Sequence, residues 1–216
     1  MKGSQEFWDK AAPRYAKSRI RDERSYRRKL AVTQEYFRPD WTVLEFGCGT
    51  GSTAIEHAPH VKHILATDVS GRMLEIAGRK ACEAGIENIE FRQGTLDDPG
   101  LPAEGFDAVL GLNVLHLLED VKGAISRVHS LLKPGGIFVS SSALVGDLKL
   151  HWRLAIPLMQ ALSLAPHVSR FGREQLLTML VEAGFSIEHD WQPNRESVFV
   201  VARRPLPASS ARCRRE

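Results

Sequence analysis

The chain has 216 residues, which is enough for one sizeable hydrophobic core and short for two independent domains. Its hydrophobic share of 43% and charged share of 25% are ordinary for a globular protein, and its glycines and prolines are scattered, so no low-complexity class is indicated. The formal net charge of +3 is unevenly distributed, because the first 40 residues and the tail from Arg203 are basic and the part between them is acidic. Basic segments can attract phosphates, an anionic lipid surface or an anionic substrate, or they can be merely solvated.

The cysteines are dispersed, and they offer neither a disulfide framework nor a metal-ligand pair, so we expect no metal site. Their pattern suits a reducing compartment. The opening residues lack the apolar run of a signal peptide, and no stretch approaches the roughly 18 apolar residues of a membrane span. A cytoplasmic protein is therefore expected.

An N-terminal helical cap is predicted over residues 1–40, with helix over 5–36 and one interruption at Pro13. Strands and helices then alternate. Strands are predicted at 42–46, 64–68, 89–92, 106–112, 137–141, 185–191 and 197–202. Helices are predicted at 52–58, 71–84, 120–132 and 173–183.

This alternation is typical of an α/β protein with a parallel sheet and helices on both faces. The last two strands are joined by a short turn at 193–194, so they must pair antiparallel. We predict a mixed seven-stranded sheet with a terminal antiparallel hairpin, contained in one domain over residues 41–203. The basic tail, 204–216, is expected to be disordered.

A glycine-rich loop, residues 47–51, follows the first strand and precedes a helix. Glycines allow a tight turn and a close approach of the backbone to a ligand. Alone this is a weak signal, because nicotinamide and flavin proteins have similar loops and glycines can also serve only a tight turn.

Two carboxylates near this loop limit the classes of ligand that it could bind. Asp68 ends the second strand, where it can accept hydrogen bonds from both hydroxyls of a ribose. Glu45 lies two residues before the first glycine, at a position that is normally apolar in dinucleotide enzymes. A carboxylate there suits a ligand that has no phosphate and has a cationic end.

The chain resembles the class I S-adenosylmethionine-dependent methyltransferases, with matching motifs between Val43 and Ser141. The motifs are Glu45-Phe46-Gly47-Cys48-Gly49-Thr50-Gly51 with Asp68, Phe106-Asp107-Ala108-Val109, and Leu131-Leu132-Lys133-Pro134-Gly135-Gly136. The resemblance implies a Rossmann-like fold, S-adenosylmethionine as cofactor with S-adenosylhomocysteine as product, and methyl transfer by in-line displacement.

The resemblance also implies a cofactor site. Asp68 would hold the ribose hydroxyls, Val69 or Met73 would pack on the adenine, and Thr95 stands where the family often has an aspartate. Asn113 would lie close to the transferred methyl. The implied cofactor-binding residues are Glu45, Gly47, Cys48, Gly49, Gly51, Asp68, Val69, Met73, Thr95, Leu96 and Asn113.

Two residues are candidates for catalysis. His116 follows the fourth strand, at the edge where open α/β sheets bind ligands, and is the best candidate for a general base. The alternative is a histidine packed beneath the next helix. Tyr15 could close over the cofactor from the N-terminal helix, with a structural role as its alternative.

Residues 143–170 follow the fifth strand, where class I enzymes commonly insert an acceptor-binding lid. The segment is apolar, and Trp152 and Arg153 are its candidate acceptor contacts, although its apolar positions would equally suit a core helix. An apolar lid beside a basic N-terminus fits an amphiphile at a membrane surface, hence a possible peripheral membrane contact. Residues 7–16 resemble the opening of quinone-biosynthesis and phospholipid methyltransferases.

The segment 113–116 lacks the Asn-Pro-Pro-Tyr type of motif used by amino-methylating DNA enzymes, so we expect a small-molecule or lipid-like acceptor and no nucleic acid. Two alternatives stay open. The first is a non-catalytic module that keeps the cofactor as a sensor. The second is a nucleotide-cofactor oxidoreductase of related topology, against which Glu45 and the terminal hairpin speak.

Overall fold

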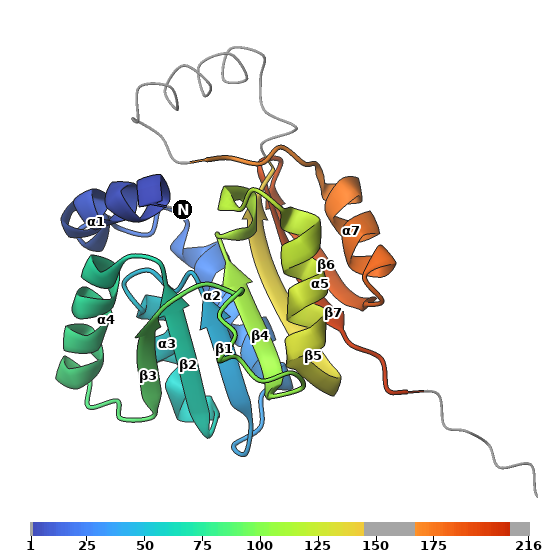
Figure 1. The fold of residues 1–216 in the computed structure, drawn as a ribbon, viewed down its shortest axis with the longest axis horizontal. Helices are drawn as coiled ribbons and strands as arrows, with labels where there is room; N and C mark the ends of the chain where they lie inside the picture. The colour runs from blue at the N-terminus through green and yellow to red at the C-terminus, as the bar shows by residue number, and fades with distance from the viewer. Residues whose placement is uncertain (1, 145–166, 208–216) are drawn as a thin grey trace, which may run out of the picture.

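The computed structural model describes residues 2–144 and 167–207. Its order of elements is that of an α/β protein preceded by two helices (Figure 1). The helices are α1 (Lys2–Ala16), α2 (Glu23–Tyr36), α3 (Ser52–His57), α4 (Gly71–Glu83), α5 (Val121–Leu131) and α7 (Arg173–Glu182), with short 3-10 turns η1 (Ala58–His60) and η2 (Leu115–Leu117). The strands are β1 (Thr42–Phe46), β2 (His63–Asp68), β3 (Ile89–Gln93), β4 (Phe106–Leu112), β5 (Leu132–Ala143), β6 (Ser186–Asn194) and β7 (Ser197–Arg203).

The seven strands form one sheet in the order β3-β2-β1-β4-β5-β7-β6. Strands β1 to β5 pair in parallel, whereas β7 pairs antiparallel with both β5 and β6. This confirms the predicted mixed sheet with its terminal hairpin. Glu45 of β1 is in register with Ala66 of β2 and Leu110 of β4, so the carboxyl ends of these strands meet at one edge. In Figure 1 this edge is at the top.

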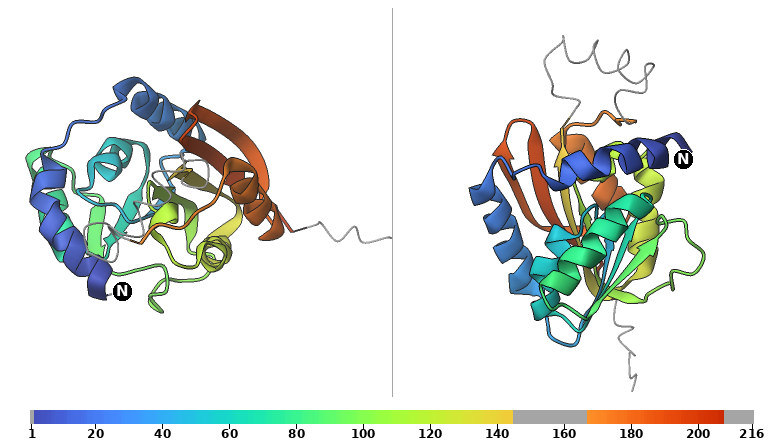
Figure 2. Two further views of the ribbon diagram at one scale, coloured as in Figure 1. Left: turned by 90° about the horizontal axis from the view of Figure 1, so that it is seen from above. Right: turned by 90° about the vertical axis from the view of Figure 1, so that its left-hand side faces the viewer.

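The sheet is buried on both faces because its strands carry apolar residues on both sides. In β1, Val43 faces the layer formed by α2 and α3, and its neighbour Leu44 faces the layer formed by α5 and α7. Figures 1 and 2 show these two layers on opposite faces of the sheet. Among the described residues, no helix combines the length and the apolar character needed to span a membrane.

The N-terminal segment differs from its prediction. The expected interruption at Pro13 is wrong, because α1 runs through Pro13 to Ala16 and the helical path breaks over residues 17–22 instead. A proline removes one backbone hydrogen bond but lies only three residues from the end of this helix. The second helix begins where the Asp22 carboxylate accepts a hydrogen bond from the backbone N–H of Ser25, an N-cap. The two helices lie on separate parts of the molecule (Figure 2).

The fifth strand also begins earlier than predicted. The structure pairs Leu132 with Phe106, and Gly135 and Gly136 exchange backbone hydrogen bonds with Arg204. The segment that was expected only to end the preceding helix is therefore strand, since chain neighbours on both sides supply partners for its backbone.

The amino ends of three strands are joined through Asp107. Its Oδ2 accepts a hydrogen bond of 2.8 Å from the backbone N–H of Thr42 on β1. Both of its carboxylate oxygens lie 2.9 Å from Nζ of Lys133 on β5. The Asp107 side chain is only 17% exposed, so these contacts are shielded more than an ordinary surface ion pair.

Replacing Asp107 with alanine is expected to lower the free energy of unfolding by about 1–3 kcal/mol, because a backbone donor and an ammonium lose their charged acceptor. Urea denaturation measures this change. The control is Glu75→Ala, which breaks an exposed ion pair with Arg72 and should cost about 1 kcal/mol or less. Equal effects of the two substitutions would contradict a stabilising role for Asp107.

Candidate functional site

The glycine-rich loop turns from β1 into α3 with its backbone packed against two other parts of the chain. Gly47 has a φ of +64°, and a β-carbon there would lie 2.5 Å from Cγ2 of Val114, in the segment that follows β4. Gly51 has a φ of +71°, and a β-carbon there would lie 2.8 Å from Cβ of Ala77 on α4. Any residue other than glycine would strain the loop at both positions.

Cys48 lies within this loop and is buried. Its backbone N–H donates to the carbonyl of Thr67 on β2, which fixes the loop against the neighbouring strand. Burial raises the pKa of its thiol well above the usual value, with the charges of Glu45 and Asp68 adding to the effect. The thiol is therefore un-ionised at neutral pH, so Cys48 is no nucleophile.

Asp68 is placed at the carboxyl end of β2, 8% exposed. Its Oδ2 accepts a 2.8 Å hydrogen bond from the backbone N–H of Gly49, and its Oδ1 accepts one of 2.9 Å from the N–H of Ser70. Burial nevertheless raises the pKa of this carboxyl, against the effect of these backbone donors. The N–H of Val69 is a third backbone donor to this carboxylate, which can accept about four hydrogen bonds and so keeps acceptor capacity for a ligand.

Glu45 lies on β1 and is 3% exposed. Its Oε2 is buried and has no hydrogen-bond partner among the described residues. Burial, reinforced by the charge of Asp68, raises the pKa of the Glu45 carboxyl to about 8. A buried acceptor without a partner is costly, so this oxygen fits a cationic or hydrogen-bonding ligand group.

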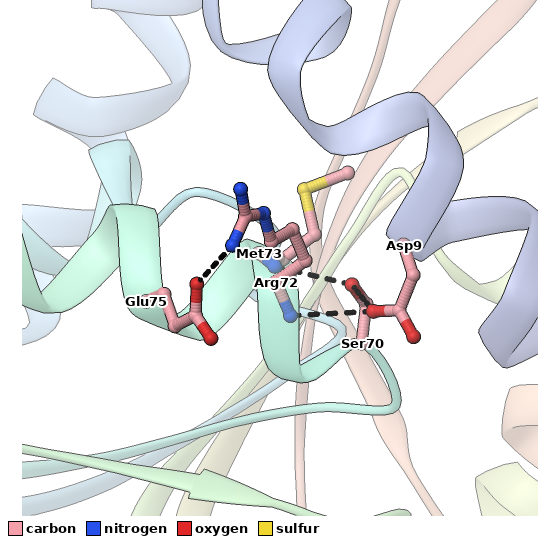
Figure 3. Close-up of polar contacts among 5 residues, drawn as sticks. All are labelled: Asp9, Ser70, Arg72, Met73 and Glu75. Atoms are coloured by element: carbon pink, nitrogen blue, oxygen red, sulfur yellow. Dashed lines mark hydrogen bonds and ion pairs between the residues drawn. The ribbon is translucent and has the colours of Figure 1, made fainter.

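Helix α1 lies against the amino end of α4, as Figure 3 shows. The Asp9 carboxylate accepts a 2.6 Å hydrogen bond from the Ser70 hydroxyl and a 3.2 Å bond from the backbone N–H of Arg72. The Ser70 oxygen in turn accepts from the N–H of Met73, the N-cap bond of α4. The link attaches α1 to the residues that directly follow Asp68.

This attachment places Tyr15 over the loop. A β-carbon at Gly49 would lie 3.8 Å from Cε1 of Tyr15, and the Tyr15 ring packs edge-on against Trp8. The ring is half-exposed. The geometry therefore leaves Tyr15 beside the glycine loop, on the side open to solvent.

The residues expected around an adenine surround the end of β2 and the loop after β3. Met73 is 2% exposed and packs with Ala12 under α1, whereas Val69 is half-buried. The Thr95 hydroxyl accepts a 3.2 Å hydrogen bond from the N–H of Asp97. Leu96 is buried in the main core.

Asn113 follows β4 with a φ of +58°, a left-handed conformation that is uncommon outside glycine. Its backbone N–H donates to the carbonyl of Ser141 on β5 at 2.6 Å, and its side-chain Oδ1 accepts from the Ser141 hydroxyl at 3.4 Å. Residues in such sparsely populated regions are concentrated at functional sites.

His116 lies in η2. Its Nδ1 accepts a 3.4 Å hydrogen bond from the backbone N–H of Ala143, and burial lowers the pKa of the ring to about 4. The ring is therefore neutral at pH 7, and the bond at Nδ1 assigns its proton to Nε2. The backbone carbonyl of His116 accepts a hydrogen bond from the N–H of Ser169, so the end of the predicted lid segment is fastened here. Trp152 and Arg153 lie outside the described residues.

Sequence reasoning missed a cavity of about 190 Å³ on the α2 side of Asn113. Lys29 of α2 lies in its lining, and its Nζ donates to the Ser141 hydroxyl at 2.8 Å. His57 also contributes to the lining and is fully buried. Lys29 is separated from Ser141 by 112 residues and sits in a run of charged residues, so no local pattern identified it.

Residues 43–136 match a family model described as a methyltransferase domain. An uncharacterized methyltransferase, YcgJ of Bacillus subtilis, is 34% identical over 110 residues, which are 51% of this chain and 44% of that protein. The ubiquinone biosynthesis O-methyltransferase of Methylocella silvestris is 33% identical over 100 residues, 46% of this chain and 39% of that protein.

Among solved structures, the geranyl diphosphate C-methyltransferase from Streptomyces coelicolor, in complex with Mg²⁺, geranyl diphosphate and S-adenosyl-L-homocysteine, is similar in fold. Its TM-score is 0.71 at 15% identity, over 84% of this chain and 79% of that chain. The chain aligns with less than half the length of the curated relatives it matches. Residues 43–136 thus match a methyltransferase domain, and the class I S-adenosylmethionine-dependent family is the one that these comparisons support.

Proposed function

We propose that this chain transfers a methyl group from S-adenosylmethionine to a small apolar or amphiphilic acceptor. The observation that carries the proposal is the pair of buried carboxylates, Glu45 and Asp68, on two sides of the glycine-rich loop. A phosphate would be repelled by the Asp68 carboxylate in a poorly solvated place, and it could not supply the donor that the Glu45 oxygen lacks. S-adenosylmethionine has a ribose and a cationic methionine end and no phosphate, so the donor set fits it.

In this proposal Asp68 binds the ribose hydroxyls with its remaining acceptor capacity, and Glu45 faces the ammonium with the oxygen that has no partner in the described chain. The cofactor supplies a sulfonium-bound methyl that is displaced in line, with the bonding pair left on sulfur. The other cofactor contacts we propose are Gly47, Cys48, Gly49, Gly51, Val69, Met73, Thr95, Leu96 and Asn113.

The work of the protein is then to hold the reactants and exclude water. Fixing two reactants in line can supply much of the acceleration, since little further chemistry is required. Tyr15, attached through α1 to the amino end of α4, would cover the bound cofactor. His116 is proposed as an acceptor contact that donates through Nε2, because its low pKa makes it a weak base.

The names of two similar enzymes support the proposed apolar or amphiphilic acceptor. The names of the two enzymes compared above specify ubiquinone biosynthesis and geranyl diphosphate, both of which involve apolar or amphiphilic small molecules. Trp152 and Arg153 stay our proposed acceptor contacts, and a peripheral contact with a membrane surface would suit an amphiphile. We place the reaction in the cytoplasm, on the grounds of the dispersed cysteines.

Isotope-labelled methyl transfer into a small-molecule extract of the source organism tests the function. Label should appear in a small product that mass spectrometry identifies, with S-adenosylhomocysteine released. Binding of S-adenosylhomocysteine without any labelled product across extracts and fractions would favour a cofactor sensor. Tight binding of NAD with no binding of S-adenosylhomocysteine would overturn the proposal in favour of an oxidoreductase.

The Asp68→Ala variant should bind S-adenosylhomocysteine about 10- to 100-fold more weakly, because hydrogen bonds to a charged acceptor are lost. Isothermal titration calorimetry measures the affinity. Asp40→Ala, which removes an exposed carboxylate just before β1, is the control and should bind normally. Unchanged affinity of Asp68→Ala would remove Asp68 from the site.

The raised pKa of Glu45 predicts a pH-dependent stability of the cofactor-free protein. Between the ordinary pKa of 4.5 and about 8, the folded state holds a proton that the unfolded chain releases, so folding stability falls as pH rises. Glu45→Gln removes this dependence. We therefore subtract the free energy of unfolding of the natural chain from that of Glu45→Gln, both measured by urea denaturation. This difference should be roughly 2–4 kcal/mol larger at pH 8 than at pH 5. A difference that does not change with pH would contradict the buried, protonated state of Glu45.

For His116→Ala we expect turnover of the identified acceptor to fall about tenfold, through loss of one hydrogen-bond donor, while affinity for S-adenosylhomocysteine stays within about twofold. Because the ring is neutral above its pKa of about 4, His116 should produce no inflection in the natural enzyme's rate between pH 5.5 and 8. Unaltered turnover would leave His116 with only its structural bond to Ala143.

A further inference from the structure

The cavity beside Asn113 lies next to the expected position of the transferred methyl. Asn113 and Ser141 bring it to the carboxyl edge of β4 and β5, and Lys29 reaches it from α2. Thr53, on the helix that follows the glycine loop, also lines it, and its hydroxyl pairs with that of Tyr26 at 3.4 Å. The cavity thus adjoins the proposed cofactor site and shares Asn113 with it.

The volume and the lining of this cavity fit a compact ligand. A dry apolar cavity of roughly 150 Å³ in another protein accommodates benzene. The present cavity, at about 190 Å³, has room for a single ring with a small substituent. Ile20, Leu30, Leu112 and Pro193 supply apolar surface for such a ring.

Lys29 brings an ammonium into this cavity, whose lining also includes the Asp22 carboxylate. Its Nζ has one hydrogen bond, to the neutral Ser141 hydroxyl, and no described carboxylate lies within ion-pair distance. Asp22 is the acidic residue whose charge acts on Lys29, but its carboxylate caps α2 through the N–H of Ser25. Burial lowers the pKa of Lys29, as expected for an ammonium that has lost much of its water.

A partly desolvated ammonium with unused donors is costly unless an anion pairs with it. We propose that this cavity binds the methyl acceptor, that the acceptor is ring-sized and carries an ionised oxygen, as a carboxylate or a phenolate, and that Lys29 binds that oxygen. The proposal rests on the proposed function, since it concerns the second substrate of the same site. Ser141 is the positioning residue, because it holds Nζ of Lys29 beside Asn113.

Matched probes test the charge requirement in the full chain saturated with S-adenosylhomocysteine. Benzoate and its neutral isostere benzamide are titrated by calorimetry or ligand-observed NMR, and 4-nitrophenolate with 4-nitroanisole forms a second pair. Each anion should bind about tenfold or more tightly than its neutral partner, the usual range for a hydrogen bond to a charged group. Tighter binding of one anion than of the other identifies the carboxylate or the phenolate as the group that Lys29 binds.

Substitutions of Lys29 test whether this residue causes the preference for anionic over neutral probes. Lys29→Met should bring the anion's affinity down to that of the neutral probe, and Lys29→Arg should restore part of the difference. Lys122→Met is the control, because Lys122 is exposed and pairs with Glu182 on α7, away from the cavity. All variants should bind S-adenosylhomocysteine within about twofold of the natural chain, which shows that they fold.

The outcomes separate the two proposals. Failure of the natural chain to bind S-adenosylhomocysteine contradicts the proposed function. If S-adenosylhomocysteine binds, the acceptor proposal is overturned by any of three results. These are no saturable binding of either anion, equal binding of charged and neutral probes, and an anion preference that survives in Lys29→Met.

Discussion

The close packing of Val114 against Gly47 is the constraint on which the site depends. Because β1 and β4 pair in parallel, the segments that leave their carboxyl ends must pass each other. They can do so only because Gly47 has no side chain, since a β-carbon there would meet Val114 at 2.5 Å. The contact holds the cofactor loop beside Asn113, and Asn113 in turn borders the acceptor cavity. The absence of a side chain at Gly47 thereby allows the glycine-rich loop to lie close to the segment that follows β4.

Around this contact the protein buries ionisable groups, of which Glu45 holds its proton at neutral pH in the cofactor-free protein. Glu45 and Asp68 are buried acids on the cofactor side, and Lys29 is a half-buried ammonium on the acceptor side. Each is unfavourable in the empty protein. Their signs are complementary to a cationic cofactor and an anionic acceptor, so ligand binding would recover what burial costs. The arrangement explains why Glu45 and Asp68 depart from the apolar pattern of the strands that carry them.

Much of the fold could be predicted from the sequence, whereas the roles of the site residues stay predictions. The strand alternation and the short turn before β7 determine the mixed sheet, and the position of Asp68 at the end of β2 follows from the length of that strand. The break between α1 and α2 was misplaced, because Pro13 is a stronger local signal than the Asp22 cap that begins α2. The Lys29–Ser141 bond could not be predicted, since it joins residues 112 apart whose local settings are an ordinary charged helix and an ordinary strand.

The central claim is that the loop, Glu45 and Asp68 form the binding site of S-adenosylmethionine. A crystal structure of the full chain with S-adenosylhomocysteine tests it most directly. We expect the ribose hydroxyls within hydrogen-bond distance of the Asp68 carboxylate, the ammonium next to Glu45, and the sulfur directed toward Asn113 and the cavity. A ligand bound elsewhere, or bound here with its ribose away from Asp68, would contradict the account.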